Sequence, residues 1–239
     1  NYSKKFSKGI YKYLGRYTDY SLGTKDSDIG TSFNLDNNNL FLLTTYKGEL
    51  NKNLGINIGL SYSENSNDSE IYIEDLDVPL DSYDDLLQFR MVLIKKMFSK
   101  SKLKFGFHLF DQSSQFINYV FYGNESGIPN EEYSGNIMLN EFLTTAFTEL
   151  DLRIFKKFAV NTGIRYEHSK LLDKKSISPR FSSAYKLGRN SQISYAYGKF
   201  FQTPDMGFDQ WYRQNNIITD YTQSNLDFEE STHHILNYE

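Results

Sequence analysis

Residues 177–205 read ISPRFSSAYKLGRNSQISYAYGKFFQTPD, and this stretch decides the fold. Two runs of alternating apolar and polar residues flank a turn at Gly188-Arg189-Asn190. The second run ends in Tyr and Phe residues just before Gln202-Thr203-Pro204. Alternating segments of about ten residues, joined by short polar turns and bordered by aromatic residues, are typical of hairpins that cross a membrane. The stretch therefore predicts a membrane-spanning β-hairpin.

The same alternation recurs along most of the chain. It is clearest from Leu54 to Tyr62, where every second residue is apolar and the residues between are small or polar, Asn57 among them. Such a pattern places all apolar side chains on one face of a strand. Further strands are predicted near residues 10–20, 40–46, 87–97, 103–109, 142–154, 160–167, 177–187 and 193–201.

The lengths of the connections also alternate. Short connections are predicted at about 47–53, 98–101, 155–158 and 188–190, and long polar ones at 64–85, 112–140 and 202–230. Only the link at about 170–176 is short where a long one is due. Brief periplasmic turns and extended extracellular loops are the outer-membrane arrangement, and sandwiches or propellers have no reason to sort loops in this way. We therefore expect an all-β fold, an antiparallel barrel wall of about nine or ten strands belonging to a larger barrel.

The amino-acid composition is compatible with an outer-membrane barrel but does not distinguish it from a soluble β-rich protein. Hydrophobic residues make up 39% of the chain and the mean hydropathy is -0.57, because loops and lumen-facing residues of a barrel are polar. The nineteen Tyr and nineteen Phe residues suit aromatic belts at two membrane interfaces. A soluble β-rich protein with a Tyr-rich core is the alternative. There is no cysteine, so disulfides and thiolate chemistry are excluded, and no apolar run is long enough for a spanning helix.

Charge argues against a nucleic-acid partner. The formal net charge is -4, whereas phosphate contacts need clustered Lys and Arg. The acidity is concentrated in residues 64–85, which contain nine carboxylates and no Lys or Arg. We expect this segment to be a solvated loop. A divalent-cation site is the alternative, although the spacing of an EF-hand is missing.

No enzyme chemistry is indicated. His233 and His234 are adjacent, so on a strand they point to opposite faces and cannot share a metal. His108 and His168 are expected near strand ends with carboxylates close in sequence, but no nucleophile stands at a recognisable spacing. We predict no catalytic residue, no metal site and no cofactor.

Three segments carry a family resemblance. They are Ser178-Pro179-Arg180-Phe181 with Ala184-Tyr185-Lys186-Leu187, then 194–204 (SYAYGKFFQTP), then 230–236 (ESTHHIL). Together with Gly163-Ile164-Arg165-Tyr166-Glu167, they resemble the later barrel strands of TonB-dependent outer-membrane receptors of the Bacteroidetes type. The resemblance is most specific over residues 140–239.

The resemblance implies a location in the bacterial outer membrane and a barrel of about 22 strands whose lumen is plugged. The family's plug domain takes part in substrate binding and is pulled by a periplasmic energy-transducing protein of the TonB type. We expect residues 1–239 to be part of one barrel domain, without the plug and the C-terminal strands, because both ends look cut. The resemblance implies four partners: outer-membrane lipid, the TonB-type complex through the plug, a small-molecule or glycan substrate, and a surface lipoprotein.

Trp211, Tyr212 and Arg213 are the predicted ligand contacts. This segment of a long loop holds the single Trp of the chain, and its side chains can stack on a ring and pair with an anion. The alternative is that Trp211 anchors the loop to the barrel rim. Active import of a siderophore, cofactor or glycan is the favoured function. A passive or adhesive barrel without energy coupling and a soluble binding module are the alternatives.

Overall fold

The computed structural model describes residues 1–26, 30–73, 76–79, 81–122, 132–204 and 226–239. They form one antiparallel sheet with the strand order β1-β2-β3-β4-β6-β7-β8-β9-β10-β11-β12, and β5 pairs with β4 beside this path. The strands are β1 (Tyr2–Phe6), β2 (Gly9–Asp26), β3 (Thr31–Asn51), β4 (Leu54–Ile73), β5 (Leu76–Pro79), β6 (Asp81–Lys96), β7 (Lys102–Tyr122), β8 (Glu132–Phe155), β9 (Phe158–Ser169), β10 (Lys174–Lys186), β11 (Gln192–Gln202) and β12 (Glu229–Tyr238); a 3-10 turn, η1 (Phe98–Lys100), links β6 and β7.

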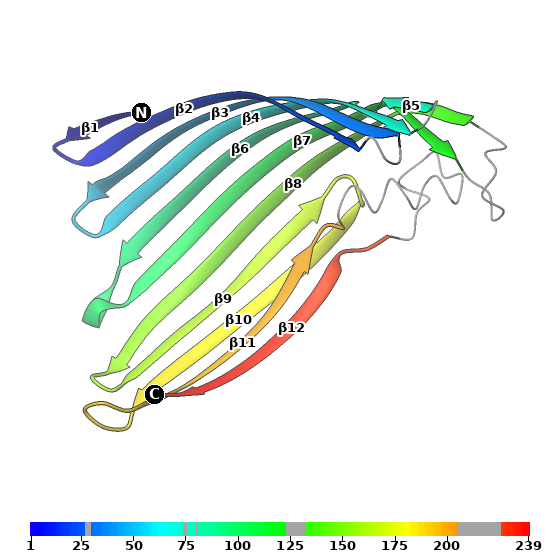
Figure 1. Cartoon of the computed structure of the whole chain (residues 1–239). Coiled ribbons are helices and arrows are strands. Elements are labelled where there is room, and N and C mark those ends of the chain that lie inside the picture. Colours follow the sequence, from blue (N-terminus) through cyan, green and yellow to red (C-terminus); the bar gives the residue numbers. More distant parts are fainter. Residues whose placement is uncertain (27–29, 74–75, 80, 123–131, 205–225) are drawn as a thin grey trace.

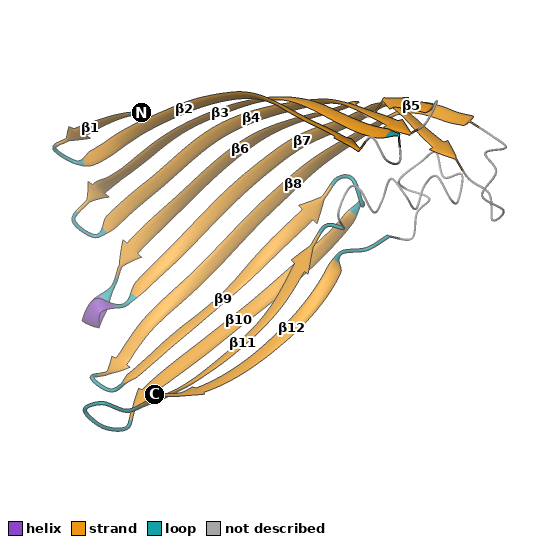
Figure 2. Cartoon of the chain, viewed as in Figure 1, coloured by secondary structure: helices purple, strands orange, loops and turns teal. Residues whose placement is uncertain are grey.

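The sheet is a curved wall rather than a closed barrel. Among the described residues, β1 and β12 each pair with a single neighbour, and they form the two opposite edges of the sheet in Figure 1. Figure 2 shows loops confined to the strand ends. The all-β antiparallel fold is confirmed. The main path has eleven strands, more than the nine or ten expected, because β1 is only five residues long and too short to show an alternating pattern.

The strand registers divide the side chains into two faces. The apolar face carries a row of partners across β4 to β10: Ile58, Met91, Phe107, Ala146, Tyr166 and Ile177. The polar face carries the neighbouring row: Asn57, Val92, Gly106, Phe147, Arg165 and Ser178. The face assignment predicted from residues 54–62 therefore holds across these six strands.

The apolar face is exposed, and the part of the sheet that the structure describes has no hydrophobic core. Leu60, Phe105, Ile164 and Ile177 are 43%, 51%, 48% and 56% exposed. Within the described residues the buried hydrophobic side chains are only Val92, Leu139, Leu172 and Phe228. A soluble protein covers such rows, which contradicts the soluble β-rich alternative. In the described part of the chain, no helix is long and apolar enough to cross a membrane.

Several strands are far longer than a bilayer requires. A crossing takes about 9–11 residues, whereas β3, β4, β7 and β8 have 21, 20, 21 and 24. Short turns close one end of the sheet (Figure 1), so the excess length projects at the other end. The predicted long loops 64–85 and 112–140 are therefore largely wrong, since most of both segments is paired strand.

Polar pairs explain why the sequence pattern missed these extensions. Beyond the bilayer both faces meet water, and the apolar alternation disappears. The strands are held by their backbone ladder and by side-chain amides: Asn37 Nδ2 donates to Asn65 Oδ1 at 2.9 Å and to Asn67 Oδ1 at 2.6 Å. Asn67 Nδ2 in turn donates to Ser82 Oγ at 3.1 Å. Amide networks of this kind carry no hydrophobic signal in the sequence.

The acidic segment is likewise not a simple solvated loop. Glu64, Asp68 and Glu70 lie on β4, and Asp84 and Asp85 lie on β6. Over the described ranges, no group of three or more His, Asp or Glu side chains is arranged to hold a metal ion.

The short outer link, predicted at about 170–176, is confirmed as the turn between β9 and β10. Glu141 of β8 is 2% exposed and reaches into this turn. Its carboxylate accepts hydrogen bonds from Ser169 Oγ at 2.5 Å and from the Leu171 N–H at 3.4 Å. Ser169 Oγ also accepts from the Leu172 N–H at 3.1 Å. A neighbouring strand thus satisfies the turn's backbone donors, and no long loop is needed.

Candidate functional site

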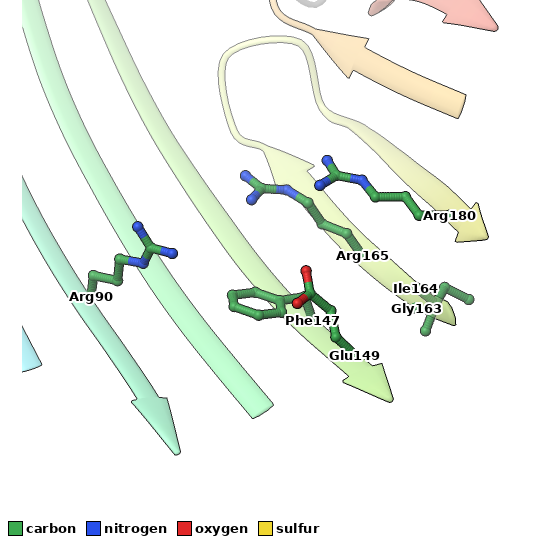
Figure 3. Close-up of a pocket in the computed structure, with 7 residues that line it drawn as sticks. All are labelled: Arg90, Phe147, Glu149, Gly163, Ile164, Arg165 and Arg180. Atoms are coloured by element: carbon green, nitrogen blue, oxygen red, sulfur yellow. The ribbon is translucent and has the colours of Figure 1, made fainter. Parts of the chain in front are cut away.

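An arginine-lined cavity on the polar face is the candidate functional site. Its lining includes Arg90 of β6, Arg165 of β9 and Arg180 of β10, with Phe147 and Glu149 of β8, and its volume is about 100 Å³. Figure 3 shows these side chains gathered around one space. Three strands separate β6 from β10, a span of about 19 Å on a flat sheet at 4.8 Å per strand. Side chains this far apart share a cavity only because the sheet curves around them, so the polar face is concave.

Strand register brings two of the arginines together. Arg165 pairs with Ser178 and Gly163 pairs with Arg180, so Arg165 and Arg180 are diagonal neighbours on one face. Glycine at 163 permits a close approach of β8, since a Cβ there would lie 2.8 Å from Thr148 O. The Arg180 guanidinium lies over the Phe200 ring, 4.9 Å from its centroid. Stacking on an aromatic ring holds a guanidinium without neutralising it.

Carboxylates balance only part of this charge. Arg165 Nη2 pairs with Glu167 Oε1 at 2.7 Å and donates to Thr145 Oγ1 at 3.4 Å. Lys104 Nζ pairs with Glu149 Oε2 at 2.9 Å. Among the described residues no carboxylate pairs with Arg90 or Arg180. The concave wall therefore presents excess positive charge at mid-height.

Phe147 closes the wall on one side of the cavity. Its ring lies over Gly106, its partner in β7, so that a Cβ at Gly106 would be 1.9 Å from Phe147 Cε1. An aromatic ring over a glycine covers backbone that would otherwise be open.

The predicted ligand contacts Trp211, Tyr212 and Arg213 lie outside the described residues, so they remain a prediction. His233 and His234 do point to opposite faces: His233 lies 5.2 Å from the Phe200 ring and His234 lies 5.1 Å from the Tyr197 ring, between centroids. On β12 they pair with Gly198 and Tyr197.

The two histidines weighed for catalysis are also kept apart. His108 lies within β7, away from its ends, and pairs with Arg90 and Thr145 on the polar face. His168 is on the apolar face, with Nε2 3.9 Å from Asp173 Oδ1. Expectation and structure differ for His108 because β7 extends well beyond its alternating segment.

The arginine site itself was not predicted from the sequence. Arg165 and Arg180 stand in quoted motifs, but Arg90 is 75 positions from Arg165. One signal in the sequence could have grouped these arginines. Each stands at a position of a predicted strand that alternation assigns to the polar face. Register between strands sets which of these meet.

A curved antiparallel sheet with a polar concave face and an exposed apolar convex face is the wall of an outer-membrane β-barrel. The chain belongs to the TonB-dependent receptor β-barrel family, since the family model described as "TonB dependent receptor-like, beta-barrel" matches residues 1–234. The predicted location in the bacterial outer membrane is thereby confirmed. The family groups receptors rather than enzymes.

One solved structure shares the fold over most of this chain. The outer membrane transporter YddB from Escherichia coli is similar at 15% identity with a TM-score of 0.68, over 84% of this chain and 31% of that chain. The siderophore receptor PirA from Pseudomonas aeruginosa matches at 11% identity with a TM-score of 0.47, over 99% of this chain and 50% of that one. The chain thus spans half or less of these proteins. No curated protein matches the sequence.

Proposed function

We propose that this wall is part of a larger outer-membrane receptor of the Bacteroidetes type that imports a scarce solute by an energy-coupled rearrangement of a plug domain. The observation that carries the proposal is the combination of family membership over residues 1–234 with a concave, charged inner face. Such a face lines a polar lumen. The proposed solute classes are siderophores, cofactors and glycans. The proposed partners are a TonB-type complex, outer-membrane lipid and a surface lipoprotein.

The test is uptake in cells that carry the complete receptor gene. Cells with and without the gene receive radiolabelled ferric chelates, cobalamin and oligosaccharides, with and without a protonophore that collapses the energy source. If the receptor imports a solute, cells with the gene should take up one of these solute classes, and the protonophore should abolish that uptake. Uptake that resists the protonophore, or binding to cells without uptake, would support the passive or adhesive alternative instead.

Trp211, Tyr212 and Arg213 are proposed to contact the solute at the outer loops. A large aromatic surface beside a guanidinium supports recognition of an anionic or ring-containing molecule. Replacing Trp211 and Arg213 by Ala should lower solute affinity at least about tenfold, the equivalent of one lost charged hydrogen bond. The amount of folded barrel in the membrane should not change. Unchanged uptake would return Trp211 to the role of a rim anchor.

A further inference from the structure

We propose that the cavity between Arg90, Arg165 and Arg180 binds an oxyanion, a carboxylate or phosphate group, on the inner wall of the barrel. The inference rests on the proposed function only in taking the concave face as a lumen. It concerns the mid-height of the wall, not the outer loops.

The charge at the cavity is unbalanced. Arg90, Arg165, Arg180 and Lys104 provide four cations, and Glu149 and Glu167 provide two carboxylates. Both carboxylates are already engaged, Glu149 by Lys104 at 2.9 Å and Glu167 by Arg165 at 2.7 Å. Two guanidinium groups are therefore left for an anion. A guanidinium presents a planar fork of donors that matches carboxylate and phosphate oxygens.

Unsatisfied donors adjoin the same place. Ser176 and Ser178 precede Arg180 on the polar face of β10, and they are 4% and 1% exposed. In the described part of the chain their hydroxyl groups have no hydrogen-bond partner, and neither has Arg180 Nε. Buried polar groups without partners are rare and mark places where a ligand or water is needed. Register pairs Ser178 with Arg165 and Ser176 with Glu167, so these hydroxyl groups lie beside the cavity, on the strand that carries Arg180.

The size of the cavity limits the ligand. About 100 Å³ has room for a few water molecules or one small anionic group, not for a whole nutrient molecule. The Phe147 ring and the engaged Glu149 border the space and disfavour a second negative charge. The site thus fits one oxyanion group, which either a passing solute or an acidic side chain from another part of the receptor could supply.

Thermal unfolding of the complete receptor in detergent tests the site. The probes are succinate and inorganic phosphate at constant ionic strength, with uncharged succinamide as the ligand control. The variants are Arg180→Gln and Arg90→Gln. Arg16→Gln is the matched control, because Arg16 lies on the same face of the sheet in β2 but outside the cavity. Arg90 is exposed and has no ion pair among the described residues, so its variant should fold even if Arg180→Gln does not.

If a solute supplies the oxyanion, we expect succinate and phosphate to raise the Tm of the wild type and succinamide to leave it unchanged. Each site variant then weakens the apparent affinity about tenfold, and Arg16→Gln leaves it unchanged. If another part of the receptor supplies the oxyanion, added anions should not change the Tm of the wild type. Both site variants should then have a lower Tm without ligand than Arg16→Gln has. If the site variants match Arg16→Gln in both measurements, the proposal is overturned. Solute uptake is not the readout, so failure of the import proposal would be seen separately.

Discussion

At the residue scale, some contacts on the polar face depend on glycine, because a Cβ would occupy the space that a neighbouring side chain fills. Gly106 allows the Phe147 ring to lie against β7, where a Cβ would be 1.9 Å from Phe147 Cε1. Gly59 lies on the same face, but a Cβ there would meet Thr45 Cγ2 only at 3.8 Å. Two glycines that look equivalent in the sequence pattern therefore have different structural roles.

Gly106→Ala should destabilise the wall by about 1 to 3 kcal/mol, since the Phe147 ring must leave its place and overpacking in a fitted contact has this cost. Urea unfolding from lipid vesicles measures the loss. Gly59→Ala is the matched control and should be close to neutral. Adding Phe147→Ala to Gly106→Ala should recover part of the stability; a double variant no better than the single one would show that the ring is not the cause.

At the element scale, the β9–β10 hairpin depends on a carboxylate from β8. Glu141→Ala removes the acceptor of Ser169 Oγ and of the Leu171 N–H and leaves buried donors unsatisfied, which costs about 1–3 kcal/mol. Hydrogen exchange at the Leu171 and Leu172 amides should accelerate along with the loss of stability. The control is Glu49→Ala, because the pair of Glu49 with Lys96 is exposed and such pairs contribute less than about 1 kcal/mol.

The outer extension of β4, β6 and β7 should depend on pH. Asp85 lies beyond Leu87, toward the outer end of β6 and outside the apolar band. Burial, followed by the charges of Asp111, Glu64 and Asp84, raises the pKa of its carboxyl. The folded state then keeps this proton at pH values where the unfolded chain, with a pKa of about 4, has lost it. Stability therefore falls as pH rises through the interval between the two values.

Asp85→Asn removes that charge, so it should stabilise the extension at pH 7 and flatten the pH dependence above about pH 4. Urea unfolding between pH 4 and pH 7 provides the comparison. Asp19→Asn, at an exposed position of β2, controls for the loss of one negative charge. Equal pH profiles for the wild type and Asp85→Asn would show that burial at Asp85 has no energetic effect.

The elements that sequence could predict are those in contact with lipid. Between Leu54 and Tyr62, lipid on one side and a polar lumen on the other impose an alternation that can be read directly. Above the membrane, residues such as Asn37 and Asn67 pair by amide hydrogen bonds, which any polar loop sequence could contain. The arginine site was missed for a different reason: Arg90 and Arg180 meet only after curvature and register across five strands are fixed.

At the scale of the whole molecule, the wall has two solvents. Its convex face leaves residues such as Phe105 and Ile177 more than half exposed, whereas its concave face groups charge around a cavity. Without a hydrophobic core among the described residues, lipid supplies the burial that a soluble domain finds inside itself. Among the described residues β1 and β12 each have one unpaired edge, and backbone groups left without hydrogen bonds in lipid are costly.

Neighbouring substitutions on one strand test this two-solvent arrangement. Ile58→Arg places a charge on the apolar face near the middle of the band and should cost about 2 to 4 kcal/mol, whereas Asn57→Arg on the polar face should be tolerated. Folding yield and urea stability in lipid vesicles measure both variants, which share strand, charge and side-chain size. The comparison tests the face, because residues 57 and 58 are neighbours on β4 and point to opposite sides of the sheet. Equal effects would mean that the convex face does not meet lipid, and the family's membrane arrangement would then not apply to this wall.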